Sequence, residues 1–170
     1  MKIHIARPRH IRSLHELIST FAHQGLLLPR SEAEIRTHLN EFLVLMEGTA
    51  IAGCVSLDAY SSSLAEIRSL AVLPAFRGRG HGRRLLLRAI EEAKDGQIAR
   101  VFAVTHAPEL FLRAGFVLSQ RREIPEKIAR DCRHCPKERS CGLVTVTANV
   151  LPETDTFPIF HGSRIAASPA

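Results

Sequence analysis

Residues 66–72, Glu66-Ile67-Arg68-Ser69-Leu70-Ala71-Val72, and residues 77–82, Arg77-Gly78-Arg79-Gly80-His81-Gly82, decide the fold of this chain. The first segment alternates polar and apolar residues at its centre, which predicts a β-strand. Pro74 ends the strand because it has no backbone N–H to donate. Behind the second segment, apolar residues recur three and four positions apart, which predicts an amphipathic helix: Leu85, Leu86, Ala89, Ile90 and Ala93.

The glycine-rich turn between this strand and this helix is typical of a phosphate-binding site. A helix N-terminus carries free N–H groups and about half a positive charge, and glycines let the backbone approach an anion closely. A Rossmann turn would need a glycine where Arg83 stands, and a Walker loop would need Gly-Lys-Ser/Thr, which does not follow. The alternative is a surface turn that binds no ligand.

The pattern that the turn does satisfy is Arg-x-x-Gly-x-Gly, at Arg77, Gly80 and Gly82. With the strand before it and the helix after it, this pattern resembles the acetyl-coenzyme A (acetyl-CoA) loop of the GNAT acetyltransferases. The resemblance implies that the strand backbone pairs with pantetheine, and that the backbone of Leu70 and Val72 serves the reaction. The cofactor contacts that it implies are Leu70, Ala71, Val72, Arg77, Gly78, Arg79, Gly80, His81, Gly82, Arg83, Thr105 and Phe111.

At 170 residues, with 45% hydrophobic and 24% charged residues, the chain has the length and composition of one globular domain. No apolar run approaches the ~20 residues that span a membrane, and the N-terminus has no signal-peptide pattern. We therefore expect a cytoplasmic protein with no membrane partner. The net charge of +6 would suit nucleic acid, but the chain has no Trp and one Tyr on which bases could stack. Arginines beside the phosphate loop explain the charge more simply, so we expect no nucleic-acid partner.

Hydrophobic periodicity predicts one domain over residues 1–150 and a loosely held tail over residues 151–170. Ser31 and Glu34 form a capping box at the start of one helix. The order of elements indicates an α/β fold with a mixed sheet. It resembles the GNAT fold, in which a mostly antiparallel central sheet, flanked by helices, is splayed at the acetyl-CoA strand. Strands are expected at 2–6, 42–46, 50–57, 66–73, 100–105, 116–118 and 143–150, and helices at 11–21, 32–39, 82–93, 108–113 and 123–130.

Three further segments resemble the N-acetylglutamate synthases: residues 24–31, 65–72 and 118–142. The resemblance implies transfer of the acetyl group of acetyl-CoA to the α-amine of L-glutamate, the first step of arginine biosynthesis, by direct attack in a ternary complex. Many such enzymes carry a kinase-like regulatory domain, so this chain looks like a short, stand-alone form. Alternatives are a GNAT enzyme acting on another amino acid, a small amine or a peptide N-terminus, and a non-catalytic basic module that binds nucleic acid. The oligomeric state stays open, with a homodimer as one alternative.

Recognition of glutamate requires cations for two carboxylates, and Arg suits this role because its planar fork binds a carboxylate through two hydrogen bonds. By resemblance to the synthases, Arg30 holds one substrate carboxylate. Arg139 and Ser140 fall near an Arg…Ser pair of the same family, and Lys127 or Lys137 is a substitute cation. The alternative for Arg30 is a solvated arginine ahead of a helix.

The attacking amine must lose a proton, so a base helps. Glu66 lies where several GNAT enzymes keep a carboxylate that acts through water, and His106 is a weaker candidate. Many GNAT enzymes place a tyrosine, as acid for the departing thiolate, where this chain has Leu112. A thiol of pKa about 8.5 is a tolerable leaving group without such an acid.

Three cysteines in the C-terminal third, Cys132, Cys135 and Cys141, include the Cys-x2-Cys half of a zinc site. A structural site needs four ligands, and neither His134 nor His161 has a clear spacing for the fourth. Reduced cysteines in a packed loop are the simpler interpretation, so a zinc ion is an alternative and not the expectation. Cys54 lies in an apolar strand and is expected in the core.

Overall fold

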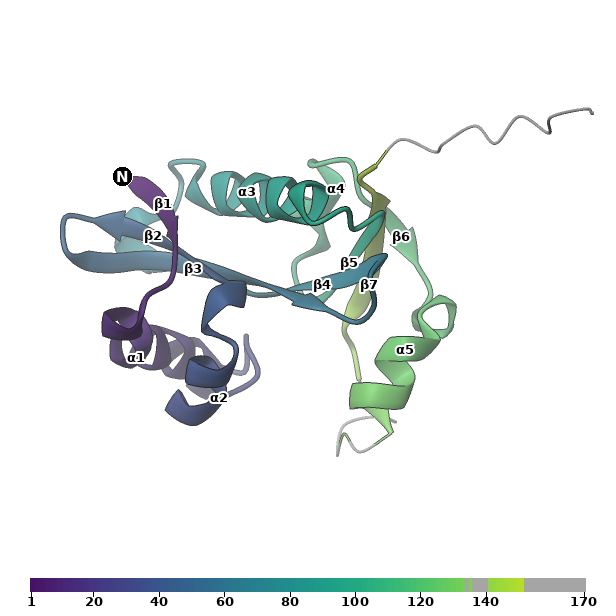
Figure 1. The fold of residues 1–170 in the computed structure, drawn as a ribbon, viewed down its shortest axis with the longest axis horizontal. Helices are drawn as coiled ribbons and strands as arrows, with labels where there is room; N and C mark the ends of the chain where they lie inside the picture. The colour runs from purple at the N-terminus through teal and green to yellow at the C-terminus, as the bar shows by residue number, and fades with distance from the viewer. Residues whose placement is uncertain (134, 136–140, 152–170) are drawn as a thin grey trace, which may run out of the picture.

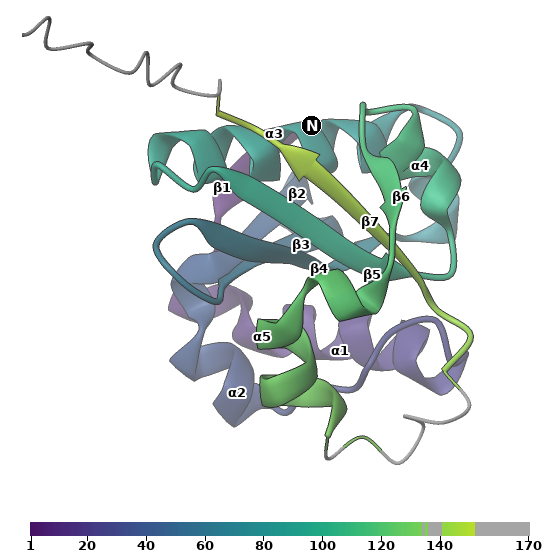
Figure 2. The same ribbon diagram turned by 90° about the vertical axis from the view of Figure 1, so that its right-hand side faces the viewer.

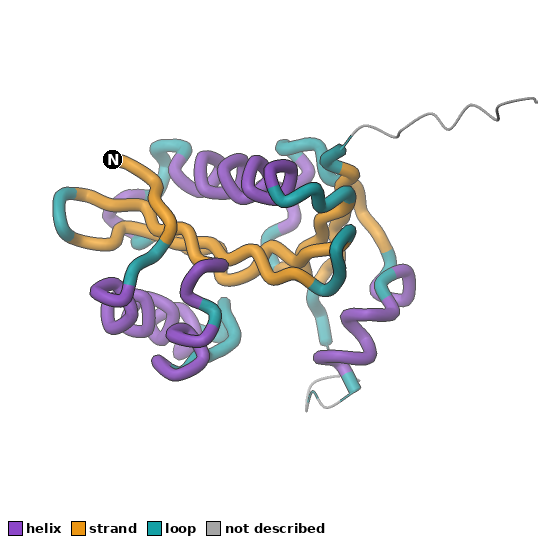
Figure 3. Tube along the Cα trace, in the orientation of Figure 1, coloured by secondary structure: helices purple, strands orange, loops and turns teal. Residues whose placement is uncertain are grey.

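The computed structural model describes residues 1–133, 135 and 141–151, which form a sheet covered by helices on both faces (Figures 1 and 3). The N-terminal half contains β1 (Lys2–Ile5), α1 (Ile11–His23), α2 (Glu32–Thr37), β2 (Phe42–Glu47), β3 (Ala50–Ala59) and β4 (Leu64–Val72). The C-terminal half contains α3 (His81–Asp95), β5 (Arg100–Thr105), α4 (Pro108–Leu112), β6 (Val117–Ser119), α5 (Pro125–Lys127) and β7 (Val144–Asn149). The predicted α/β class and element order are confirmed.

In the described part of the chain, the sheet has seven strands in the order β1-β2-β3-β4-β5-β7-β6. Neighbouring strands are antiparallel except β4 and β5, which are parallel and joined through α3. Helices α3 and α4 cover one face, and α1, α2 and α5 lie on the other, as Figures 1 and 2 both show. The mixed, mostly antiparallel sheet flanked by helices agrees with the GNAT expectation.

The two faces of the sheet carry separate hydrophobic cores. The predicted apolar stripe of α3, with Leu85, Leu86 and Ala89, is buried against β2, β3 and β4. The stripe of α1, with Leu14, Leu17, Ile18 and Phe21, fills the opposite face together with Phe42 and Val44 of β2. A third, small cluster of Leu64, Phe102 and Ile124 lies under α5. Alternating side chains of the central strands therefore face different helices.

Local signals in the sequence set the boundaries of several elements. Ser31 accepts a hydrogen bond from the N–H of Glu34 (3.2 Å), and Glu34 accepts one from the N–H of Ser31 (2.7 Å), so the capping box is confirmed. Helix α2 ends at Thr37, two residues before the predicted end, and residues Leu39–Glu41 form a 3-10 turn. The helical segment predicted at 123–130 is α5 followed by a π-helical turn, Ile128–Cys132.

The prediction of a tail over residues 151–170 lies outside the described residues from position 152 onward. None of the helices in the part of the chain that the structure describes has the length and apolarity that crossing a bilayer requires.

Gly53 of β3 approaches β4 so closely that no side chain fits. A Cβ at this position would lie 2.7 Å from the carbonyl oxygen of Ala71, a backbone atom that cannot swing away. We expect Gly53→Ala to lower the free energy of unfolding by about 1–3 kcal/mol, the usual range for overpacking, as measured by urea denaturation. Gly142→Ala is the matched control, because a Cβ there meets nothing within 4 Å. Equal stability of the two variants would contradict the prediction.

Candidate active site

The backbone of β4 is open on the side that faces β5. The two strands pair only at Leu64–Arg100, Ala65–Val101 and Glu66–Phe102, and then part. The segment from Ile67 to Val72 therefore continues along β3 without a described partner on its other side. An extended ligand can pair with such a free strand edge through its own amides. Leu70, Ala71 and Val72, the predicted pantetheine contacts, all lie on this edge.

A β-bulge interrupts β4 at the point where it has left β5. Cys54 pairs with Ala71 and Ser56 with Arg68, so two residues of β4, Ser69 and Leu70, oppose a single residue of β3. Ser69 has a positive φ of 51°. Bulges of this kind redirect backbone groups and recur near active sites.

The thiol of Cys54 fixes the orientation of the peptide inside this bulge. Burial raises the pKa of Cys54 to about 12, so the thiol keeps its proton and donates to the carbonyl oxygen of Ser69 at 3.2 Å. That carbonyl shares a trans peptide plane with the N–H of Leu70, so the two groups point in opposite directions. Because the carbonyl is directed at the Cys54 thiol, the N–H of Leu70 is directed away from that thiol.

The glycine-rich loop connects this edge to the N-terminus of α3. Gly78 and Gly80 have φ values of +75° and +74°, a conformation in which other residues are strained. Gly80 is also the N-cap of α3 and provides no side chain to cap the helix. The first N–H groups of α3 are thus left to a ligand or to water. Gly82, one residue inside the helix, lies close to Leu110 of α4.

The basic side chains of this loop have two different placements. Arg79 and Arg83 are exposed. Arg77 folds back along β4, where its Nε donates to the carbonyl oxygen of Val72 at 3.0 Å and its guanidinium lies 5.3 Å from the ring centre of Phe21. The half-buried ring of His81 lies 3.3 Å from Arg84, atom Nδ1 to atom Nη1.

The remaining predicted cofactor residues lie around the start of α4. The hydroxyl of Thr105 accepts a hydrogen bond from the N–H of Ala107 at 3.0 Å, which shapes the turn between β5 and α4. Phe111 is buried, edge-to-face against Phe116 at 5.3 Å, so its ring belongs to the core. His106 is exposed, and Leu112 is exposed at the C-terminal end of α4.

A cleft of about 540 Å³ opens on the face of the sheet that carries α1, α2 and α5. Its floor is formed by the two central antiparallel strands, and its walls come from segments far apart in the sequence. The lining residues are Leu28, Pro29, Arg30, Glu34 and His38 on one wall, Asp58 and Arg68 on the floor, and Arg130 and Asp131 on the other wall. Charged groups of both signs therefore surround one hollow.

Arg30 contributes a guanidinium to this cleft. It is half-buried, with its Cζ atom 5.7 Å from the ring centre of Phe42. Among the described residues, its buried Nη2 atom has no hydrogen-bond partner. Burial and the charge of Arg68 lower the pKa of Arg30, and the charges of Asp58, Glu41 and Glu34 oppose this. A buried donor without a partner is costly, so this guanidinium is suited to an anionic ligand.

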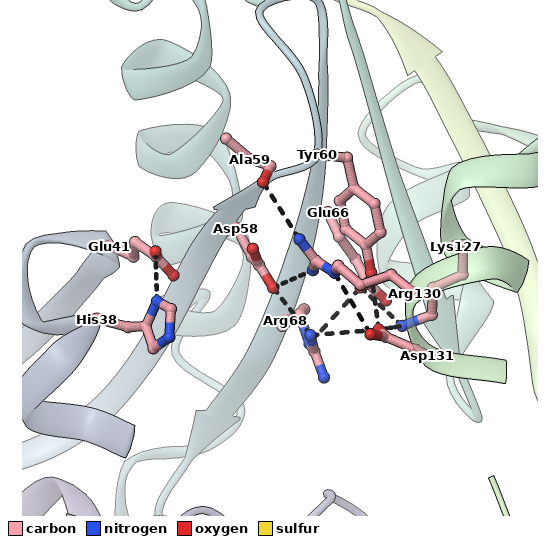
Figure 4. A network of polar contacts seen from close by, with 10 residues as sticks. All are labelled: His38, Glu41, Asp58, Ala59, Tyr60, Glu66, Arg68, Lys127, Arg130 and Asp131. Atoms are coloured by element: carbon pink, nitrogen blue, oxygen red, sulfur yellow. Dashed lines mark hydrogen bonds and ion pairs between the residues drawn. The ribbon is translucent and has the colours of Figure 1, made fainter. Parts of the chain in front are cut away.

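The opposite wall is tied to the floor by a network of charged side chains (Figure 4). Arg68 and Arg130 both donate to Oδ2 of Asp58, at 2.8 Å and 2.6 Å. The guanidinium of Arg130 also stacks 3.4 Å from the ring centre of Tyr60 and donates to the carbonyl oxygen of Ala59 at 3.3 Å. These contacts connect β3 and β4 to the C-terminal helical segment.

Deeper in the network, Lys127 bridges two carboxylates. Its Nζ lies 2.8 Å from Glu66 and 2.6 Å from Asp131, and Arg68 lies 3.6 Å from Glu66. Glu66 is 3% exposed and Lys127 is 7% exposed. Two predicted residues, the base and one substrate cation, thus contact each other below the cleft surface, and Glu66 reaches the cleft only through its neighbours.

Not every predicted site residue can be placed. Arg139 and Ser140, with Lys137, lie outside the described residues, as does His134. Cys132 is buried, Cys135 is half-buried, and Cys141 accepts a hydrogen bond from Arg121 at 3.0 Å. Within residues 1–133, 135 and 141–151, no three His, Cys, Asp or Glu side chains gather as a metal site would require.

Sequence reasoning missed four charged residues of the cleft wall and floor, Asp58, Arg68, Arg130 and Asp131, and also Tyr60, whose hydroxyl contacts Asp131. One signal was available, because Glu66 and Arg68 are two apart on a strand and must share a face. Asp58 also stands directly opposite Glu66 on β3. The partners from the C-terminal segment had no local signal.

Asp131 gives the network a measurable pH dependence. Burial alone would raise the pKa of Asp131, but hydrogen bonds from Lys127 and Tyr60 and the charges of Lys127 and Arg68 lower it to about 2 from an ordinary 3.8. The unfolded chain therefore takes up this proton first, and stability falls as the pH drops from about 5 toward 2. Urea denaturation across this range should show a shallower decline for Asp131→Asn than for the wild type. Parallel curves would contradict the placement of Asp131.

The chain is similar to known proteins in both sequence and architecture. The family model described as "Acetyltransferase (GNAT) family" matches residues 9–116. An uncharacterised N-acetyltransferase of Chlorobaculum tepidum is 35% identical over 141 residues, which cover 83% of this chain and 91% of that protein. An amino-acid acetyltransferase of Neisseria meningitidis is 35% identical over 119 residues, 69% of this chain but only 27% of that longer protein.

Among solved structures, the N-acetylglutamate synthase of Neisseria gonorrhoeae, complexed with coenzyme A and N-acetyl-glutamate, superposes with a TM-score of 0.80 at 29% identity. The match covers 88% of this chain and 35% of that one, so the chain corresponds to about a third of the synthase. The splayed sheet, the glycine-rich loop at α3 and these matches agree: the chain belongs to the GNAT acetyltransferase family.

Proposed function

We propose that the protein transfers the acetyl group of acetyl-CoA to the α-amine of L-glutamate, by direct attack within a ternary complex. The observation that carries the acceptor assignment is the guanidinium of Arg30 in the cleft, whose buried Nη2 atom has no hydrogen-bond partner among the described residues. It lies on one wall, while Arg68 and Arg130 line the floor and the other wall. Cations on more than one side suit an acceptor with two carboxylates. The likeness to amino-acid acetyltransferases and to the gonococcal synthase supports the same choice.

The residues around β4 and α3 fit the cofactor. The free edge of β4 offers backbone groups to an extended pantetheine arm, and Gly78 and Gly80 leave room for phosphates at the start of α3. Exposed Arg79 and Arg83 add positive charge beside that helix N-terminus. Bound there, acetyl-CoA supplies the thioester acetyl group. The N–H of Leu70, directed away from the Cys54 thiol, would donate to the thioester carbonyl as negative charge develops on it.

The acceptor would lie in the cleft on the other face of β3 and β4. Arg30 holds a carboxylate there, and the predicted contacts with Arg139 and Ser140 complete the set. Lys127 contributes positive charge from beneath the cleft surface, where its ammonium group contacts both Glu66 and Asp131. Glu66 remains the proposed base, acting through intervening groups since it is buried. Leu112 stands in place of the acid found in many relatives, so the thiolate leaves without a dedicated proton donor.

The direct test is thiol release from acetyl-CoA in the presence of single amino acids. L-glutamate should support turnover well above L-glutamine, L-aspartate and L-lysine. Turnover with a basic amino acid or a peptide N-terminus alone would show that the acceptor assignment is wrong while the family assignment stands. Binding of coenzyme A without any turnover would contradict the amino-acid acceptor altogether.

Removal of the Arg30 guanidinium should weaken acceptor binding. A hydrogen-bonded charged pair contributes about 1.5–3 kcal/mol, so Arg30→Ala should raise the KM for L-glutamate by about 10- to 100-fold. The KM for acetyl-CoA should not change. Arg36→Ala, which removes an exposed arginine of α2 outside the cleft lining, is the matched control. An unchanged KM for L-glutamate in Arg30→Ala would remove the carboxylate role from this residue.

The bulge peptide gives a separate prediction about catalysis. Cys54→Ala removes the thiol that orients the peptide between Ser69 and Leu70, and we expect kcat to fall about 10-fold, equivalent to about 1.4 kcal/mol. Cys54→Ser keeps a donor and should retain most of the rate. Val44→Ala, at the buried position paired with Cys54 on β2, controls for lost core packing. If kcat falls equally in Cys54→Ala and Val44→Ala at equal Tm, the thiol has no orienting role.

A further inference from the structure

Tyr60, the only tyrosine of the chain, has its hydroxyl between two carboxylates (Figure 4). The hydroxyl oxygen lies 2.8 Å from Oε2 of Glu66 and 2.8 Å from Oδ2 of Asp131. The ring is held edge-to-face against Phe102 at 5.3 Å and under the guanidinium of Arg130 at 3.4 Å. Both the ring and the hydroxyl therefore have close partners within the network.

The number of protons in this arrangement does not match the number of contacts. A phenol has one proton, so it can donate to only one of the two carboxylates, although both lie at hydrogen-bonding distance. Asp131 is held as a carboxylate, since its pKa is lowered to about 2. If Glu66 takes up a proton, Glu66 donates to the phenol oxygen and the phenol donates to Asp131. Every short contact is then a hydrogen bond, so the geometry is complementary to a proton on Glu66.

The two carboxylates differ in their access to the cleft. Asp131 lines the cleft, with 27% of its side chain exposed, whereas Glu66 is enclosed and does not line it. The hydroxyl of Tyr60 is therefore the bridge between a carboxylate that the acceptor can approach and the proposed base behind it. Lys127 contacts the same two oxygens, but as a donor to both of them, so it does not offer an acceptor between them.

We propose that Tyr60 relays the proton released by the acceptor amine from Asp131, at the cleft, to the buried carboxylate of Glu66. The N–H bond of the amine breaks, and its proton passes through water to Asp131. The Asp131 O–H bond then breaks toward the phenol oxygen of Tyr60 as the phenol O–H bond breaks toward Glu66. The step ends with protonated Glu66, anionic Asp131 and neutral Tyr60. This inference rests on the acetyl transfer proposed above.

The charges around the relay balance one another. The strands contribute Asp58, Glu66 and Arg68, and the C-terminal segment contributes Lys127, Arg130 and Asp131, which gives three carboxylates and three cations. Asp131 faces Lys127 at 2.6 Å and Arg68 at 3.5 Å, and Glu66 faces the same two cations at 2.8 Å and 3.6 Å, so the two carboxylates of the relay have the same cationic neighbours. Burial and the charge of Glu66 raise the pKa of Tyr60, so the phenol passes protons without accumulating as phenolate.

Tyr60→Phe tests the relay because it removes only the hydroxyl and keeps the ring under Arg130. With acetyl-CoA and L-glutamate, we expect kcat near pH 7 to fall about 100-fold, the lower end of typical acid–base contributions, while both KM values stay within about twofold. The loss should shrink as the pH rises toward the pKa of the acceptor amine, because an amine that arrives deprotonated has less need of the relay. Ser62→Ala, in the same exposed loop, is the control and should keep full activity.

The alternative is that Tyr60 only holds the cleft wall. In that case Tyr60→Phe would raise the KM for L-glutamate with kcat unchanged, at every pH. That result, or full activity of the variant at pH 7, would overturn the relay. Wild-type protein that turns over none of the amino acids would instead refute the proposed function.

A second measurement tests the relay geometry without any acceptor. With one Tyr and no Trp in the chain, the near-ultraviolet absorbance of tyrosinate reports Tyr60 alone. We expect the folded protein to develop no tyrosinate absorbance as the pH is raised past the ordinary tyrosine pKa of about 10. Reversible ionisation near that value in the folded protein would place Tyr60 outside the two carboxylates and overturn the inference.

Discussion

The parting of β4 and β5 is the constraint on which the rest of the structure depends. Parallel strands need a crossover, and here α3 provides it, so the glycine-rich loop must begin where β4 ends. Because the ladder stops at Glu66 and Phe102, the next residues of β4 have no described strand beside them on that side. The bulge at Ser69 lies within this stretch. Strand edge, bulge and helix N-terminus thus follow one another along a single path.

The charged network holds a short C-terminal segment in a fixed position against the sheet. The segment made of α5 and the π-helical turn has few buried apolar residues, with Ile124 before its start and Cys132 at its end. Buried ion pairs add little net stability, because desolvation offsets their attraction, but they accept few alternative arrangements. Lys127, Arg130 and Asp131 therefore fix the direction of the cleft wall more than they stabilise the fold.

The sequence was sufficient for the central strand, the loop and α3, because strand alternation, the position of Pro74 and the spacing of Leu85 and Ala89 are local signals. The capping box at Ser31 was visible for the same reason. The cleft wall was not predictable in this way. Tyr60 and Asp131 are 71 positions apart, and Arg68 and Asp131 are 63 apart, so only the folded chain brings them together. Lys127 was recognised as a cation, but its burial beside Glu66 has no signature in a single sequence.

The sheet consists of two antiparallel units, which meet at the parallel pair of β4 and β5. Strands β1 to β4 lie side by side in the order in which they occur along the chain, and β7 lies between β5 and β6. Between the units, the backbone ladder is three residue pairs long. A seam of this kind opens more easily than either unit, as local unfolding follows the weakest set of hydrogen bonds. A ligand that lies along the seam contacts both units and raises the free energy of their separation by mass action. The ligand thus supplies contacts between the units where the β4–β5 ladder ends. The cooperativity of unfolding should therefore rise with the fraction of protein that has ligand bound.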